Sequence, residues 1–114
     1  MKVAIVGSRN YPELDKVREF VRTLPKNAII ISGGAKGVDQ TVEDEARIQG
    51  LEVISVTPEW DKWGKRAGLV RNDMIVSLAH QVVAFWDGVS RGTKYTIDKA
   101  KEKNVIVQVF NVVN

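Results

Sequence analysis

The sequence predicts an α/β fold with three layers, in which a five-stranded, mainly parallel sheet carries helices on both faces. Two observations favour this class. Five short runs rich in Val and Ile recur along the chain, and segments with apolar residues at helical spacing separate them. Strands that alternate with helices form β-α-β units, whose strands pair in parallel and are covered on both sides. The range 1–114 is expected to form one domain.

The apolar runs place the strands, and glycine, proline and capping residues place the helix ends. Expected strands span 2–6, 28–32, 51–56, 81–86 and 105–110, and expected helices span 12–24, 38–49, 68–78 and 93–103. Gly50 is the expected C-cap of the second helix and Thr93 the N-cap of the fourth. Helical spacing predicts that the third helix turns four apolar side chains inward: Val70, Met74, Ile75 and Leu78.

Composition excludes several kinds of site. The chain has no cysteine and one histidine, so disulfides and thiolate metal sites are excluded, and we expect neither a metal nor a cofactor. No apolar run reaches membrane-spanning length, and the first residues lack the apolar region of a signal peptide. We therefore expect a cytoplasmic protein with no membrane partner.

The segment 28–39 predicts a strand, a tight turn and the start of a helix. Three glycines, Gly33, Gly34 and Gly37, follow the apolar run and let the backbone approach a ligand. The first N–H groups of a helix lack intrahelical partners and carry the positive end of its dipole, which favours a phosphate. Ser32 stands where a G-x-G-x-x-G motif has its first glycine, so the dinucleotide fingerprint is not met. A turn that only lets a helix pack on a strand is the alternative.

Two further features of the chain have two readings each. Asp39 lies in the turn itself, where a carboxylate can orient a ribose hydroxyl or hold a loop N–H group. Trp60 and Trp63 interleave with Lys62, Lys65 and Arg66 in the long irregular stretch 57–67. Such a stretch suits base stacking beside phosphate contacts, whereas the indoles would alternatively cap the core or bury themselves in a dimer.

The glycine turns and the tryptophan loop all follow strands and therefore meet at one edge of the sheet, where ligands of such folds bind. A second turn, Asp87 to Thr93, offers hydroxyls and N–H groups for a phosphate or sugar. In these loops eight basic residues face five acidic ones, an excess of +3 that suits an anionic ligand. The basic residues are Arg9, Lys36, Lys62, Lys65, Arg66, Arg71, Arg91 and Lys94, and the acidic ones are Asp39, Glu59, Asp61, Asp73 and Asp87.

Four motifs, in this order, resemble the SLOG superfamily, nearest to its YspA-like branch. They are Val6-Gly7-Ser8-Arg9, the segment 32–39 (Ser-Gly-Gly-Ala-Lys-Gly-Val-Asp), the segment 71–76 (Arg-Asn-Asp-Met-Ile-Val) and Asp87-Gly88 with Gly92-Thr93. The superfamily includes the DNA-processing protein DprA, the LOG phosphoribohydrolases and the nucleoside deoxyribosyltransferases. The resemblance implies a Rossmann-like domain and a nucleotide-like ligand.

One position departs from the enzymes of that superfamily. In LOG enzymes and deoxyribosyltransferases a glutamate that acts on the N-glycosidic bond follows the Gly-Thr turn by three residues, and here Thr96 stands in its place. A threonine supplies neither a carboxylate nucleophile nor a stabilising charge. No catalytic residue is assigned, Asp87 and Asp39 being the weak candidates, and the chain is expected to bind rather than to catalyse.

Three functions remain, in this order of preference. The first is sensing or sequestering a nucleotide or nucleotide-derived ligand, the second is cleavage or transfer at a nucleotide's glycosidic bond, and the third is DprA-like binding of single-stranded nucleic acid. Either a monomer or a homodimer is compatible with the sequence. The expected ligand-binding residues are Gly7, Ser8, Arg9, Ser32, Gly33, Gly34, Lys36, Gly37, Asp39, Trp60, Arg71, Asn72, Asp87, Gly92 and Thr93.

Overall fold

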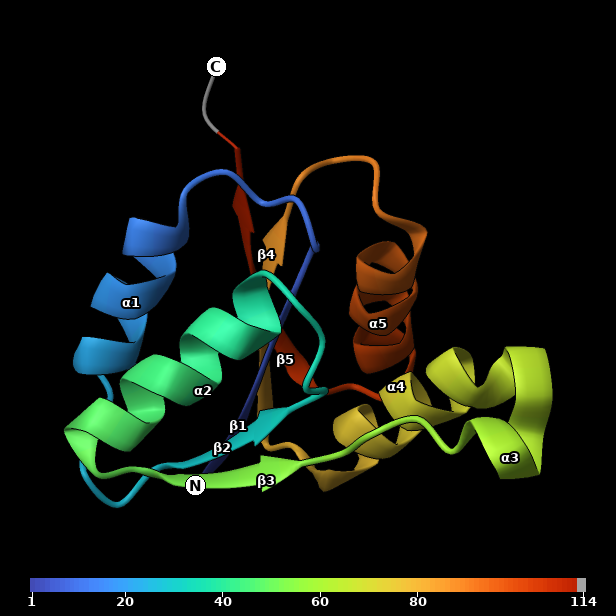
Figure 1. The fold of residues 1–114 in the computed structure, drawn as a ribbon, viewed down its shortest axis with the longest axis horizontal. Coiled ribbons are helices and arrows are strands. Elements are labelled where there is room, and N and C mark those ends of the chain that lie inside the picture. Colours follow the sequence, from blue (N-terminus) through green and yellow to red (C-terminus); the bar gives the residue numbers. More distant parts are fainter. Residues whose placement is uncertain (113–114) are drawn as a thin grey trace.

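A computed structural model describes residues 1–112 of the chain and confirms the α/β class (Figure 1). Its five strands are β1 (Lys2–Gly7), β2 (Ile29–Ser32), β3 (Glu52–Ser55), β4 (Gln81–Trp86) and β5 (Ile106–Asn111). Its helices are α1 (Leu14–Arg22), α2 (Val38–Gln49), α3 (Trp60–Trp63), α4 (Ala67–Leu78) and α5 (Arg91–Glu102), with a short 3-10 helix η1 (Gly64–Arg66) before α4. The strands pair in parallel throughout, in the order β3-β2-β1-β4-β5.

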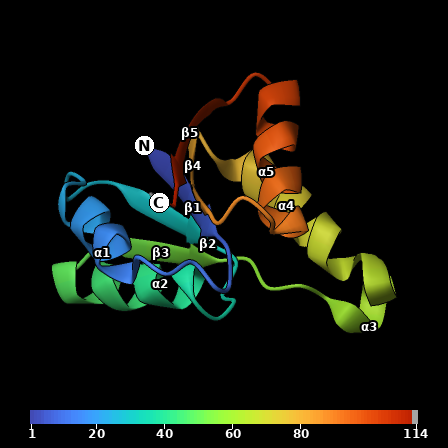
Figure 2. The ribbon, with the colours of Figure 1, turned by 90° about the horizontal axis from the view of Figure 1, so that it is seen from above.

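Helices cover both faces of this sheet, α1 and α2 on one and α4 and α5 on the other (Figures 1 and 2). Alternation along β1 divides the core accordingly: Val3 and Ile5 pack with α1 and α2, whereas Ala4 and Val6 pack with α4 and α5. The interior strands are apolar on both sides, as expected for strands covered on both faces.

The strand order reverses at β1. The chain runs outward from β1 through β2 to β3, then crosses to β4, which pairs with the other side of β1. The loops that follow β1 and β4 therefore leave toward opposite faces and open a crevice between the two strands. In open parallel sheets this reversal point is where ligands bind.

Several element boundaries differ from the sequence predictions. The stretch 57–67 contains α3 and η1, because one turn of helix is too short for its apolar spacing to be recognised. The N-cap of α5 is Ser90, so the prediction of Thr93 was wrong; Thr93 lies inside the first turn. Gly50 does cap α2, in the left-handed conformation expected of it.

The inward face of α4 was also predicted only in part. Ile75 is buried, but Met74 and Leu78 are exposed. The helix instead turns Asn72 and Val76 inward, since its first turns border the crevice and its last turns border the sheet. Within residues 1–112, no helix combines the length and the apolar character that crossing a membrane requires.

Candidate functional site

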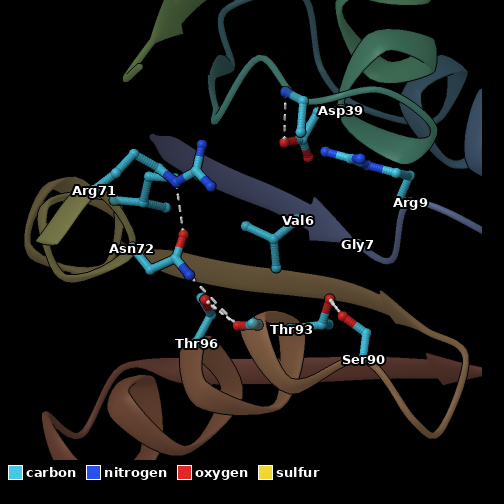
Figure 3. A pocket seen from close by; sticks show the side chains of 12 residues that line it. Val6, Gly7, Arg9, Asp39, Arg71, Asn72, Ser90, Thr93 and Thr96 are labelled. Atoms are coloured by element: carbon cyan, nitrogen blue, oxygen red, sulfur yellow. Dashed lines mark hydrogen bonds between the residues drawn. The ribbon is translucent and has the colours of Figure 1, made fainter. Parts of the chain in front are cut away.

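A small pocket of about 160 Å³ opens at the crevice between β1 and β4 (Figure 3). Its floor is the end of β1, with Arg9 and Asp39 on one side, α5 hydroxyls on the other, and Arg71 and Asn72 of α4 between them. A phosphate or a sugar fits within this volume. The lining residues are Val6, Gly7, Arg9, Ala35, Asp39, Arg71, Asn72, Ile75, Ser90, Gly92, Thr93 and Thr96.

Arg71 is held at the pocket by its own neighbours. Its Nη1 donates to the carbonyl oxygen of Gly33 at 2.8 Å, and its Nε donates to Oδ1 of Asn72 at 2.7 Å. Asn72 Nδ2 donates in turn to the carbonyl oxygen of Gly92 at 3.5 Å, so these two side chains join β2, α4 and α5. Nη2 of Arg71 has no hydrogen-bond partner among the described residues, which leaves a fixed cationic N–H group for an anion.

The glycine turn before α2 lets this arrangement close. A Cβ atom on Gly33 would lie 2.7 Å from Nη1 of Arg71, and one on Gly37 would lie 2.3 Å from the carbonyl oxygen of Arg9. Gly37 has φ +83°, a conformation that side chains disfavour. Gly37 thus permits the loop after β1 to approach the α2 terminus, and Gly33 makes room for the guanidinium.

Asp39 is the carboxylate of the pocket. Its side chain is buried, at 6% exposure; Oδ2 accepts the N–H of Ala35 at 3.1 Å, while Oδ1 has no partner within residues 1–112. Burial raises the pKa of Asp39 from 3.8 to about 6, with a further rise from Glu43, against the lowering effects of the Ala35 N–H and of Arg71. Oδ1 of Asp39, an acceptor without a partner among the described residues, thus lies in the same pocket as the guanidinium of Arg71.

The start of α5 supplies hydroxyls and free backbone donors. No side-chain hydrogen bond caps α5, so the N–H groups of its first turn lack a side-chain acceptor among the described residues. Ser90 Oγ and Thr93 Oγ1 lie 3.2 Å apart, and Thr96 Oγ1 donates to the carbonyl oxygen of Gly92. Such a terminus is a ready site for an anion.

The structure brings together seven of the fifteen residues expected to bind ligand: Gly7, Arg9, Asp39, Arg71, Asn72, Gly92 and Thr93. The other eight lie outside the pocket lining: Ser8, Ser32, Gly33, Gly34, Lys36, Gly37, Trp60 and Asp87. Lys36 is exposed next to the lining residue Ala35, and Trp60 lies on α3, outside the pocket. A ligand-binding role for all fifteen stays a prediction.

Three polar residues among those eight hold loops. Ser8 Oγ accepts the N–H of Asp87 at 3.1 Å, and Ser32 Oγ donates to Glu43 at 2.7 Å. Asp87 Oδ1 accepts the N–H groups of Val89 and Ser90, and these bonds lower the pKa of Asp87. The carboxylate of Asp87 is thus engaged in shaping the turn before α5.

Ser90 also lines the pocket and belongs to the turn Asp87 to Thr93, whose hydroxyls the sequence offers for a phosphate or sugar. Four lining residues were not expected from the sequence: Val6, Ala35, Ile75 and Thr96. Thr96 carries a hydroxyl on the helix that follows a strand, a signal that could have pointed to it. Val6 and Ile75 are apolar residues with no such signal. Among the described residues, no group of three His, Cys, Asp or Glu side chains is placed to hold a metal ion.

Replacing Gly33 by alanine is expected to displace Arg71 without unfolding the protein. The added Cβ meets the far end of a flexible side chain at 2.7 Å, and the backbone at Gly33 has no positive φ. We expect the melting temperature to fall by at most about 5 °C, equivalent to about 1 kcal/mol. Thermal unfolding measures this against Gly68→Ala, where the new Cβ meets open space; a collapse of the Gly33 variant alone would contradict it.

Comparison with known proteins places this chain in a family. Residues 1–60, which include the first two motifs and the α2 terminus, match the model of the DNA recombination-mediator protein A family. The gene 61 protein of Mycobacterium phage D29 is 30% identical over 119 residues, covering 96% of this chain and 95% of that protein. The match with that protein therefore extends over both halves of the pocket.

Solved structures share the fold. The DNA processing protein A (DprA) of Streptococcus pneumoniae superposes with a TM-score of 0.80 and 25% identity, over 99% of this chain and 50% of that one. DprA of Helicobacter pylori, whose structure was described for its single-stranded DNA binding mode, superposes with a TM-score of 0.71 and 22% identity. That match covers 96% of this chain and 64% of the H. pylori chain. This chain thus spans about half to two thirds of those proteins, and it belongs to the DNA recombination-mediator protein A family.

Proposed function

We propose that the chain binds single-stranded DNA, with backbone phosphates seated in the pocket between β1 and β4. The observation that carries the proposal is the convergence of Arg9, Arg71 and the uncapped terminus of α5 on one small pocket. Exposed Lys36 lies beside it. Phosphate contacts supply most of the affinity of non-specific nucleic-acid binding, and cationic side chains with helix N–H groups are their usual donors.

The comparisons change the order of the hypotheses. Binding of single-stranded nucleic acid is the third hypothesis from the sequence, because the net charge is only +3 and the basic residues form no continuous stripe. Membership in the recombination-mediator family and the described DNA binding of the H. pylori protein support it above the other two. We further propose that residues 1–114 act as one binding domain of the SLOG superfamily's YspA-like branch. In support, the Arg71-Asn72 and Gly92-Thr93 motifs lie beyond the matched range 1–60 but line the same pocket as Gly7 and Arg9.

A second candidate is binding of a nucleotide-derived small molecule, the first hypothesis from the sequence. One observation favours it: Oδ1 of Asp39 is buried without a partner, and a ribose hydroxyl would satisfy it. Bond cleavage has less support, since Asp39 is the one carboxylate among the lining residues and Thr96 bonds its own helix.

The proposed DNA binding is tested by the fluorescence anisotropy of a labelled oligothymidylate of about 15 nucleotides. Arg71→Ala is expected to weaken binding about tenfold and to reduce the slope of log K against log salt by about one, because one phosphate contact is lost. The affinity of Arg71→Lys should lie between those of the wild type and Arg71→Ala, since lysine keeps the charge but not the fork geometry of the guanidinium.

A matched control is Arg47→Ala. Arg47 is an exposed arginine in the last turn of α2, paired with Asp44 and outside the pocket lining. It should bind like the wild type. If the wild-type protein does not bind the oligonucleotide at low salt, the proposed function is wrong. It is also wrong if Arg71→Ala and Arg47→Ala lose the same affinity.

A further inference from the structure

A short arm projects from the body of the protein between β3 and α4. This tryptophan arm, residues 59–66, comprises α3 and η1 and lies beyond the layered core in two perpendicular views (Figures 1 and 2). Every residue of the arm is exposed. Trp60 is 59% and Trp63 39% exposed, although tryptophan is on average a largely buried residue. Two exposed indoles on a projecting segment indicate a contact surface.

The arm carries three cations, Lys62, Lys65 and Arg66, close to its indoles in the sequence. Nζ of Lys62 lies 5.1 Å from the centre of the Trp63 ring, a cation–π contact that orients both side chains. Within residues 1–112, no carboxylate forms an ion pair with Lys62, Lys65 or Arg66. With Glu59 and Asp61 counted, the arm keeps one excess positive charge.

Continuity with the pocket indicates which partner the arm meets. The arm leads directly into α4, and Arg71 follows Arg66 by five residues, about 8 Å along a helix axis. A strand whose phosphate lies at Arg71 reaches the arm within a few nucleotides. Charge argues against a second protein copy as the partner, because every residue between the indoles and beside them is polar or glycine, and interface cores are depleted of charge.

We propose that the tryptophan arm is a second contact for single-stranded nucleic acid, on which bases of the strand leaving the pocket stack. This inference rests on the proposed DNA binding and adds the element that holds the bases. Every base has a π-face, so stacking on Trp60 and Trp63 is tolerant of sequence. Cations beside the rings would meet the phosphates between stacked bases.

The test separates the arm from the pocket by oligonucleotide length. Anisotropy is measured with labelled oligothymidylates of about 2 and about 15 nucleotides, for the wild type and the Trp60→Ala/Trp63→Ala variant. The longer strand should lose about tenfold or more in affinity, whereas the shorter strand, which fills only the pocket, should change little. Trp60→Phe/Trp63→Phe should restore most of the loss, because it keeps two aromatic faces.

Controls keep the outcomes distinct. Ile48→Ala removes an exposed apolar side chain from α2 and should bind like the wild type; thermal unfolding checks that the double variant folds. Trp60→Ala alone should fold, because the indole is exposed. It should show about half of the double variant's loss of affinity for the longer strand, which gives a second, independent measurement. Unchanged binding of the longer strand by the double variant overturns the inference but leaves the pocket proposal standing.

Two other outcomes also overturn it. If the wild type binds neither length, the proposed function fails and the arm's role fails with it. If sedimentation shows that the wild type is a dimer and the double variant a monomer, while binding of the longer strand is equal, the arm is a self-association surface. Loss of affinity for the longer strand in a folded variant, restored by phenylalanine, supports the inference.

Discussion

Gly37→Ala is expected to destabilise the protein by roughly 3–5 kcal/mol, the largest effect of any single glycine substitution in the described loops. The backbone at Gly37 has φ +83° and ψ −122°, a region that is strained for alanine. The new Cβ would also lie 2.3 Å from the carbonyl oxygen of Arg9 and 2.9 Å from its carbonyl carbon. Because these are backbone atoms, the loop after β1 must move away from α2.

Thermal unfolding measures this effect, with a melting temperature lower by roughly 15 °C or more. Gly50→Ala is the matched control: Gly50 has φ +75°, but nothing lies within 4 Å of the added Cβ. It should show the backbone strain alone, about 1 kcal/mol. Equal losses for the two variants would show that the close approach to Arg9 contributes nothing.

Asp39→Asn is expected to change the pH dependence of both stability and binding. The pKa of Asp39 is about 6 in the folded protein and 3.8 ordinarily, so the unfolded chain releases its proton first as the pH rises. The side chain's contribution to stability is therefore greatest below about pH 4 and is lost between about pH 4 and pH 7. Two units of pKa correspond to about 3 kcal/mol.

Asparagine removes that loss, because its amide oxygen can accept the N–H of Ala35 without carrying charge. We expect the difference in unfolding free energy between variant and wild type to shift in favour of the variant by roughly 2 kcal/mol from pH 4.5 to pH 8. Denaturant unfolding at the two pH values measures it. A difference that stays constant would mean that Asp39 titrates normally.

The same substitution distinguishes the two candidate ligands. For a phosphate in the pocket, removing the nearby carboxylate charge should tighten oligothymidylate binding several-fold at pH 8, and wild-type binding should strengthen as the pH falls through about 6. A ribose hydroxyl would instead lose its acceptor, so a ribonucleotide should bind more weakly to the variant. Titrations with both ligands at pH 8 decide between the two proposals.

Much of the fold follows from short-range signals in the sequence. The β-branched runs form the strands because both faces of a parallel sheet are buried, and Gly50 ends α2 because it takes the left-handed conformation with little strain. The one-turn helix α3 escaped prediction, since four residues carry no periodic pattern. Met74 and Leu78 have the helical spacing of an inward face, but they are exposed in the structure. Asn72 and Val76 are buried in α4 instead.

The site was harder to predict because polar residues in loops have two uses. Ser8, Ser32 and Asp87 have the composition of ligand-binding residues, but their side chains bond to neighbouring loops and helices. Arg71 and Asp39 both line the pocket, yet their exposure and partners depend on which loops approach them. Sequence spacing gives the sheet edge, whereas tertiary contacts decide which side chains remain free there.

The β1–β4 boundary divides the chain at a seam. Everything before α3 belongs to one side, where Arg9 and Asp39 lie, and α4 and α5 supply Arg71, Ser90 and Thr93 from the other. A ligand in the pocket therefore clamps the N-terminal and C-terminal halves together. Any molecule that spans the seam must raise the unfolding temperature as its concentration rises above its Kd, so thermal stability itself reports which ligands the pocket accepts.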